Sequence, residues 1–120
     1  MNIEEFRDYC MSKRGTEETL PFDEYTLVYK VMGKMYALTS LNSEEFRINL
    51  KCDPERAIEL RDEHADIIPG YHMNKKHWNT LVLEHDSLHE DLIIELIEHS
   101  YDLVVSKLTK KLKTELEELS

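Results

Sequence analysis

The sequence contains few of the residues that cross-link or interrupt a chain. Its 120 residues include three glycines, three prolines, two cysteines and one tryptophan. Cys10 and Cys52 are too few for a disulfide scaffold and too far apart for a CxxC redox site. Each falls in an apolar pattern, which predicts a small buried side chain. No apolar run approaches the roughly 20 residues of a membrane-spanning helix, so no membrane partner is expected.

Linkers, repeats and low-complexity tracts are also missing. A chain of this length predicts one domain, residues 1–120, with a single hydrophobic core. Residues 1–5 are acidic and include no basic or long apolar stretch, so a signal peptide is not expected. These features predict a monomeric protein that resides in the cytoplasm.

Basic residues are outnumbered, with 15 lysines and arginines against 25 acidic residues and a net charge of -10. On average, such a chain repels nucleic acids and anionic membranes. The charges are segregated, however, because residues 25–43, 67–83 and 103–114 contain lysines but no acidic residue. A local binding face is therefore compatible with the acidic total.

Capping residues and hydrophobic periodicity predict the elements of the N-terminal half. A helix is expected at residues 3–13, with Asn2 as its N-cap and Gly15 beyond its end. The dipeptide Met32-Gly33 is typical of a hairpin turn between two strands. Alternation and turn residues place strands at 19–22 (an edge strand, since it contains Pro21), 25–31, 34–40 and 45–52.

The strand at 45–52 alternates most clearly between apolar and polar side chains. Its apolar residues are expected to face the core: Phe46, Ile48, Leu50 and Cys52. Its polar residues are expected to face outward: Arg47, Asn49 and Lys51. The pattern indicates a sheet with one buried face and one solvated face.

A second helix is expected directly after this strand. Asp53 serves as its N-cap and Pro54 as its first residue, and it ends near residue 64. Its inward-facing residues are predicted to be Ala57, Ile58 and Leu60. A loop at 66–75 and a strand at 78–83 follow.

The last part of the chain is expected to be helical. Ser87 and Glu90 form an S-x-x-E capping box at the start of a helix that ends near residue 107. Thr109 then starts a final helix, with Leu112, Leu116 and Leu119 on one side. The order α-β-β-β-β-α-β-α-α predicts an α+β fold, in which an antiparallel sheet is packed on one face by helices.

The segment 69–80 combines residue types that suit nucleic-acid binding. Lysines neutralise phosphates, asparagines hydrogen-bond bases or backbone, and aromatic rings stack on unpaired bases. The candidate contact residues in this segment are Tyr71, Asn74, Lys75, Lys76, His77, Trp78 and Asn79. Arg47, Asn49 and Lys51, outward on a neighbouring strand, extend the candidate surface.

Other interpretations of this segment remain open. In a purely structural interpretation, Trp78 enters the core, while Tyr71, Asn74 and Asn79 form hydrogen bonds with the backbone groups of a tight loop. In a protein-interaction surface, Tyr71, Met73 and Trp78 would be apolar anchors inside a rim of lysines. A small-molecule pocket would be lined by Tyr71, His72 and Trp78.

Catalytic and metal-binding patterns are missing from the sequence. It has no G-x-S-x-G motif, no glycine-rich phosphate loop and no cysteine with a plausible partner base. Glu95, His99 and Asp102 share a helix face, but a solvated polar stripe explains them without a metal. We therefore expect a protein that is not an enzyme and needs no metal or cofactor.

Several longer strings carry a family resemblance that covers nearly the whole chain. They are Leu20-Pro21-Phe22, residues 27–37, Leu50-Lys51-Cys52-Asp53-Pro54, residues 69–80 and Ser100-Tyr101-Asp102-Leu103-Val104. In these strings the chain resembles the MmcQ/YjbR family of small bacterial proteins. The resemblance implies a CyaY-like α+β fold, described as a double-wing DNA-binding motif. The leading prediction is a DNA-binding (nucleic-acid-binding) module that uses segment 71–80 and the adjoining sheet face.

Overall fold

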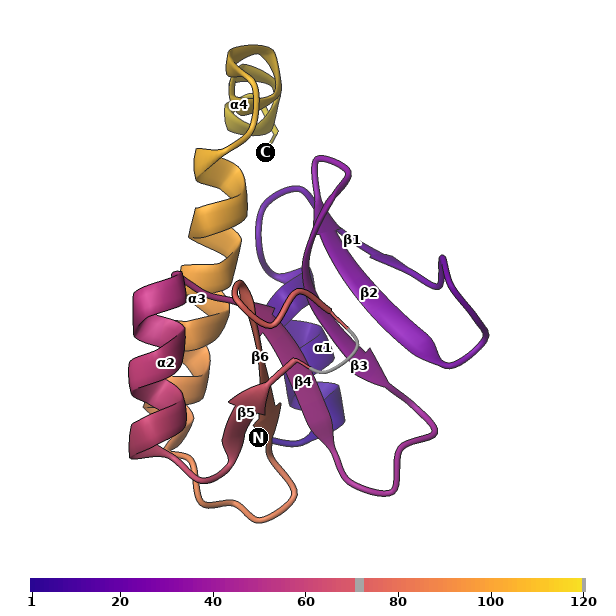
Figure 1. Ribbon diagram of the computed structural model, residues 1–120. Helices are drawn as coiled ribbons and strands as arrows, with labels where there is room; N and C mark the ends of the chain where they lie inside the picture. The colour runs from indigo at the N-terminus through magenta and orange to yellow at the C-terminus, as the bar shows by residue number, and fades with distance from the viewer. Residues whose placement is uncertain (71–72, 120) are drawn as a thin grey trace.

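A six-stranded antiparallel sheet with helices packed on one face forms the fold (Figure 1). The computed structural model describes residues 1–70 and 73–119. The strands lie side by side in the order β1-β2-β3-β4-β6-β5, and every neighbouring pair is antiparallel. The elements are α1 (Ile3–Met11), β1 (Thr16–Thr19), β2 (Thr26–Val31), β3 (Lys34–Ser40), β4 (Arg47–Lys51), α2 (Pro54–Glu63), β5 (Ile67–Pro69), β6 (Trp78–Val82), α3 (Glu90–Ser106) and α4 (Lys110–Glu117).

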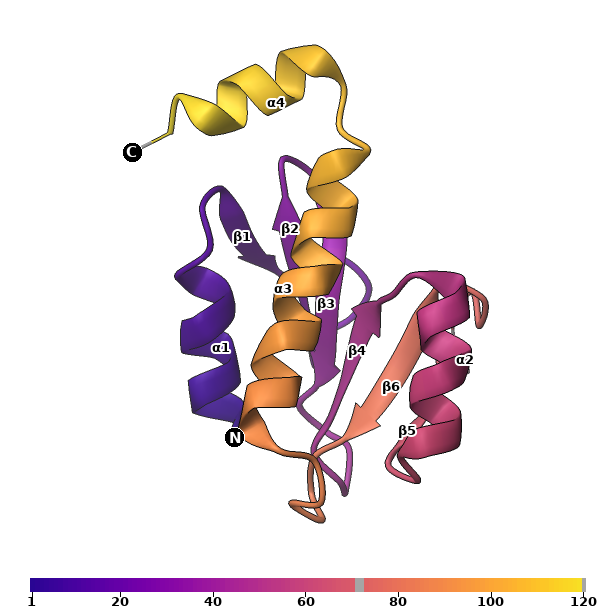
Figure 2. The same ribbon diagram turned by 90° about the vertical axis from the view of Figure 1, so that its left-hand side faces the viewer.

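The helices divide the covered face of the sheet among themselves. Figure 2 shows α1, α3 and α2 side by side in front of the strands, with α4 beyond one end of the sheet. α3 packs on β2, β3 and β4, whereas α1 packs on β1 and α2 on β5. The predicted α+β class and the packing of helices on one face are therefore confirmed. Within the described residues, no helix has the length and apolar character needed to span a lipid bilayer.

Side-chain caps fix most of the helix starts where the sequence predicts them. Asn2 accepts a hydrogen bond from the Glu5 N–H (2.8 Å), and the Glu5 carboxylate accepts one from the Asn2 N–H (3.0 Å). Asp53 caps α2 in front of Pro54, and Thr109 caps α4. The predicted capping box at Ser87 is wrong: His89 caps α3, since the Ser87 hydroxyl instead donates to the Asp66 carboxylate at 2.5 Å.

Local turn chemistry also fixes the central hairpin. Met32 and Gly33 have φ angles of 50° and 82°, the left-handed pair that a two-residue hairpin turn requires.

The predicted edge strand is shifted, because residues 16–19 rather than 19–22 pair with β2. Pro21 lacks an N–H and lies beyond the strand. The strand β5 lies within the predicted loop at 66–75, where three residues are too few to show alternation.

Most of the core lies between the helices and the sheet. Its largest fully buried side chains include Phe6, Tyr29, Tyr36, Ile48, Leu50 and Ile97. Both cysteines are buried as predicted, and burial raises the pKa of Cys10 to about 12 and that of Cys52 to about 11. The predicted burial of Ile58 is wrong: it is 58% exposed, because α2 packs through Ala57 and Leu60.

Ser100 of α3 joins the helix to two strands. The register between β3 and β4 ends at the pair Ala37 and Leu50. Beyond that pair, the buried Ser100 hydroxyl donates to the Tyr36 carbonyl (2.5 Å) and accepts from the Lys51 N–H (2.9 Å). One side chain thus replaces the missing strand-to-strand hydrogen bond and fixes α3 over the middle of the sheet.

The substitution Ser100→Ala tests this bridge. It leaves a buried carbonyl and a partly buried N–H without partners, and should lower the free energy of unfolding by about 1–3 kcal/mol. Urea denaturation measures the change. Ser106→Ala is the control, since that exposed hydroxyl bonds only the Leu103 carbonyl of its own helix. Equal effects of the two substitutions would contradict the role of Ser100.

Candidate functional site

The face of the sheet opposite the helices is open. Directly paired residues point to the same face of an antiparallel sheet, so Val28, Leu38, Asn49 and Thr80 form a row across β2, β3, β4 and β6. The alternate residues Ile48 and Leu50 belong to the helix-covered core. The row therefore marks the centre of the open face.

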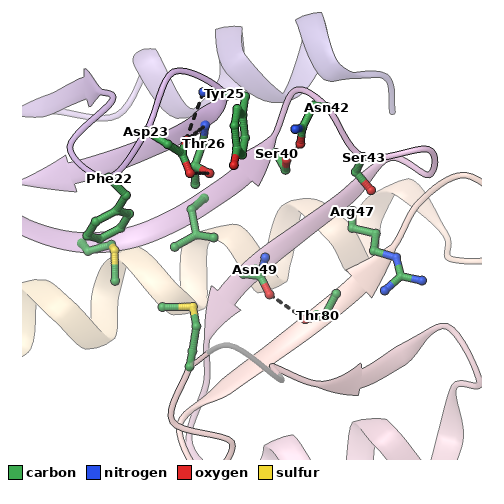
Figure 3. Close-up of a pocket in the computed structure, with 13 residues that line it drawn as sticks. Phe22, Asp23, Tyr25, Thr26, Ser40, Asn42, Ser43, Arg47, Asn49 and Thr80 are labelled. Carbon is green, nitrogen blue, oxygen red and sulfur yellow. Dashed lines mark hydrogen bonds between the residues drawn. The ribbon is translucent and has the colours of Figure 1, made fainter.

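A cavity of about 900 Å³ lies over this row. Figure 3 shows Phe22 at one end of the cavity, Ser43 and Arg47 at the other, and Asn49 between them. The lining comes from strands β2, β3, β4 and β6, from the β1–β2 and β3–β4 connections, and from one residue after β5. Its residues are Phe22, Asp23, Tyr25, Thr26, Met35, Leu38, Ser40, Asn42, Ser43, Arg47, Asn49, Thr80 and Met73. Apolar side chains and amide or hydroxyl groups therefore share one concave surface.

Two carboxylates near the cavity are held by neighbouring donors. Asp23 accepts from the backbone N–H groups of Tyr25 (3.0 Å) and Thr26 (2.7 Å). Glu45 accepts from the Arg47 guanidinium at 2.7 Å and 3.1 Å, and these hydrogen bonds lower the pKa of Glu45. The Asp23 carboxylate thus holds the β1–β2 connection in place, and that of Glu45 orients Arg47.

Charge is distributed unequally between the two sides of the molecule. The charged residues of strands β2 through β6 are all basic: Lys30, Lys34, Arg47 and Lys51. Helices α1 to α4 hold 14 of the 25 acidic residues, with Glu90, Asp91, Glu95, Glu98 and Asp102 in α3 alone. An anion over these strands would therefore meet basic strand residues, although Asp23 also lines the cavity.

The candidate strand residues face outward as predicted. Arg47, Asn49 and Lys51 are half-buried and lie on the open face. Arg47 and Asn49 line the cavity, while Lys51 is paired with Trp78 further along β4. The structure thus brings two of the three into one concave site.

The candidate loop residues are distributed more widely. Lys75 and Lys76 are exposed, and so is Asn74, whose side chain accepts from the Lys76 N–H at 3.0 Å. His77 is half-buried, and its carbonyl accepts from the Cys52 N–H at 2.8 Å. Tyr71 and His72 lie outside the described residues. Met73 is the one described residue of this loop that lines the cavity.

Trp78 is buried, which corrects its assignment as a contact residue. It is 7% exposed and lies on the open face, outside the helix-covered core. A side-chain carbon at Gly70 would approach the Trp78 Cβ to 3.1 Å, so glycine permits this close packing. The ring is therefore not accessible for stacking, and the prediction of Trp78 as an exposed protein-binding anchor is wrong.

Asn79 is also removed from the candidate contacts. It is 2% exposed and faces α2, where its Oδ1 accepts from Arg61 Nε at 2.6 Å and its Nδ2 donates to the Ala57 carbonyl. Arg61 also donates to the carbonyl oxygens of Lys75 and Trp78. Asn79 thus ties α2 to the sheet and, through Arg61, to the turn before β6.

Two exposed aromatic residues at the cavity were missed as candidates. Phe22 is 67% exposed and Tyr25 43% exposed. Both had been assigned to strands, Phe22 to the predicted strand at 19–22 and Tyr25 to that at 25–31. The available signal was Pro21 with Asp23, since a proline and an aspartate typical of turns flank Phe22.

The polar residues of α3 and the start of α2 hold these helices together. His99 Nε2 accepts from the Asp53 N–H at 3.2 Å, and Glu95 pairs with Arg56. Burial, together with nearby Arg56, lowers the pKa of His99. Among residues 1–70 and 73–119, no group of three His, Cys, Asp or Glu residues is arranged to hold a metal ion.

The pKa values of two histidines should be shifted in opposite directions from the ordinary value. His99 should titrate below 6.5, so its contribution to stability is present above that pH and is lost as the pH falls through its folded pKa. His85 has a raised pKa because it hydrogen-bonds Asp66, so its contribution is present below 6.5 and is lost as the pH rises through its folded pKa. NMR titration of the imidazole carbons measures both. A midpoint of His99 above that of His85 would contradict these assignments.

Known proteins with similar sequences cover nearly the same region. The family model called YjbR matches residues 11–103. The uncharacterized protein YjbR of Escherichia coli strain K12 is 34% identical over 111 residues, which are 92% of this chain and 93% of that protein. The uncharacterized protein YbdF of Escherichia coli O157:H7 is 41% identical over 92 residues, which are 76% of this chain and 74% of that protein.

Solved structures show the same architecture. A crystal structure of a Deinococcus radiodurans protein with the domain called DUF419 superposes with a TM-score of 0.89 at 43% identity, covering 97% of this chain and 88% of that one. A Pseudomonas syringae protein superposes with a TM-score of 0.72 at 33% identity, covering 86% of this chain and 98% of that one. Both identities are high enough to support kinship as well as a shared fold.

Proposed function

The chain belongs to the YjbR family, and we propose that it binds single-stranded nucleic acid across the open face of its sheet, without catalysing a reaction. The observation that carries this proposal is the charge distribution, since strands β2 to β6 contain basic residues and no acidic residue. Phosphates on this face would lie among Lys30, Arg47 and Lys51 and away from the acidic helices. A ligand of this kind also fits a cytoplasmic location.

The cavity favours a single strand over a duplex. Unpaired bases expose their flat faces, and proteins bind them by stacking on aromatic side chains over a basic groove. Phe22 and Tyr25 offer exposed rings at the cavity, and Arg47 offers a cation. A duplex would keep its base faces inside the stack. The DNA-binding role that the resemblance implies is retained here in this narrower form.

The segment after β5 would continue the path of the strand. Met73 lines the cavity, and the exposed Lys76 follows three residues later. Lys51 lies on the same face, opposite Trp78. Both lysines lie at the Lys51–Trp78 end of β4 and β6, where they would contact phosphates on one side of a base held in the cavity and so determine affinity rather than sequence preference.

Salt dependence tests the electrostatic part of the proposal. A labelled mixed-sequence DNA strand of about 12 nucleotides should bind at low salt and weaken as salt rises. The double variant Lys51→Ala with Lys76→Ala should reduce the slope of log K against log salt by roughly 0.7 per lost phosphate contact. Fluorescence anisotropy measures both quantities.

A charge-matched control separates a local contact from net charge. Lys110→Ala with Lys111→Ala removes the same charge from exposed positions on α4. This variant should keep the wild-type slope, because α4 lies beyond the end of the sheet (Figure 2). Equal slopes for the two double variants, or no binding at low salt, would refute the proposed function.

Phe22→Ala tests the stacking contact. Loss of one stacked base should weaken binding by about 1–3 kcal/mol. Because Phe22 is mostly exposed, the unfolding midpoint should change little. Ile58→Ala is the control, since it removes an exposed apolar side chain from α2, on the opposite side of the sheet. If both variants bind as tightly as the wild type, Phe22 is not a stacking platform.

A further inference from the structure

Asn49 occupies the centre of the open face. It lies in the middle of β4, with Leu38 beside it on β3 and Thr80 beside it on β6. Its side chain is half-buried and lines the cavity between Phe22 and Arg47 (Figure 3). A base stacked near Phe22, with its phosphate near Arg47, would place its polar edge over Asn49.

The amide of Asn49 is held in one orientation. The Thr80 hydroxyl donates to Asn49 Oδ1 at 2.5 Å. This bond turns Oδ1 toward Thr80 and leaves the two hydrogens of Nδ2 for another partner. Within residues 1–70 and 73–119, Nδ2 of Asn49 has no acceptor in the protein. The amide therefore presents donors to whatever enters the cavity.

Other amide and charged groups in the cavity lining are oriented in a similar way. The Ser40 hydroxyl donates to Asn42 Oδ1 at 2.8 Å, which again leaves the amide hydrogens. The carboxylate of Asp23 accepts from two backbone N–H groups and from the Thr26 hydroxyl at 3.0 Å. Arg47 has donors only. The Asn49 and Asn42 amides and Arg47 thus present donors along the cavity, which complement a ligand edge that carries acceptors.

From this arrangement we propose that the cavity selects nucleobases with a carbonyl at position 4, such as uracil or thymine, over cytosine, and that Asn49 determines the selection. The inference rests on the proposed function and specifies its ligand. Uracil and thymine carry a carbonyl acceptor at position 4, where cytosine has an amino donor. An amino group facing Nδ2 of Asn49 would leave two donors opposed, and each buried group without a partner weakens binding.

Two oligonucleotides of equal length and charge measure the selection. Single strands of about 12 deoxyuridines or 12 deoxycytidines should both bind, the first more tightly by roughly 5- to 100-fold. Asn49→Ala removes the donor and should bring the ratio of the two Kd values close to one. Fluorescence anisotropy at neutral pH and constant salt gives both constants, and circular dichroism checks that each variant is folded.

Thr80 supplies a matched pair of variants. Thr80→Val removes the hydroxyl that holds Asn49 Oδ1, so the amide is free to turn and the preference for deoxyuridine should fall. Thr80→Ser keeps the hydroxyl and should keep the preference. Both substitutions leave the charge of the protein unchanged, so differences in overall electrostatic attraction do not enter the comparison.

The outcomes distinguish this inference from the function on which it rests. Equal binding of the two strands by the wild type, or an unchanged preference in Asn49→Ala or Thr80→Val, overturns the selection. Salt-dependent binding would in that case still support the proposed function. Absence of binding to either strand at low salt overturns both.

Discussion

The packing of α1, α2 and α3 on one face of the sheet is the constraint from which the rest of the molecule follows (Figure 2). The apolar side of α3 needs a surface to cover, and strands β2 to β4 provide it through residues such as Tyr36, Ile48 and Leu50. The bridge from Ser100 to both β3 and β4 fixes the helix over the sheet centre. Because these helices leave the second face uncovered, the cavity forms there, over Leu38 and between the connecting loops and strands (Figure 2).

The same constraint separates the charges. The outer sides of the helices are solvated and hold many acidic residues without cost to packing, whereas the open strands hold bases. The edges of the sheet are protected by other means. β1 carries Glu17 and Glu18, and β5 is short and ends at Pro69, which has no N–H to offer another chain. An open face without exposed pairing edges is suited to ligands rather than to further strands.

Features set by neighbouring residues were predictable from the sequence, and features set by distant contacts were not. The Met32-Gly33 turn and the caps Asn2, Asp53 and Thr109 depend on a few adjacent residues, and all were found as predicted. The outward direction of Arg47 and Asn49 followed from alternation. The burial of Trp78 and Asn79 depends instead on Gly70 and Arg61, which meet them only after folding. The cavity likewise combines segments that no local pattern connects. The sequence therefore did not identify Phe22 and Tyr25 as residues of the candidate site.

The contacts of Arg61 give the protein a mechanical link between its two sides. The guanidinium of this α2 residue binds the Asn79 side chain and the carbonyl oxygens of Lys75 and Trp78. The turn next to the cavity is therefore attached, through one side chain, to a helix that lies on the opposite face. Arg61 therefore joins three segments that are distant in the sequence: α2, the turn before β6 and the first residues of β6. Loss of this one side chain would remove contacts on both sides of the sheet at once.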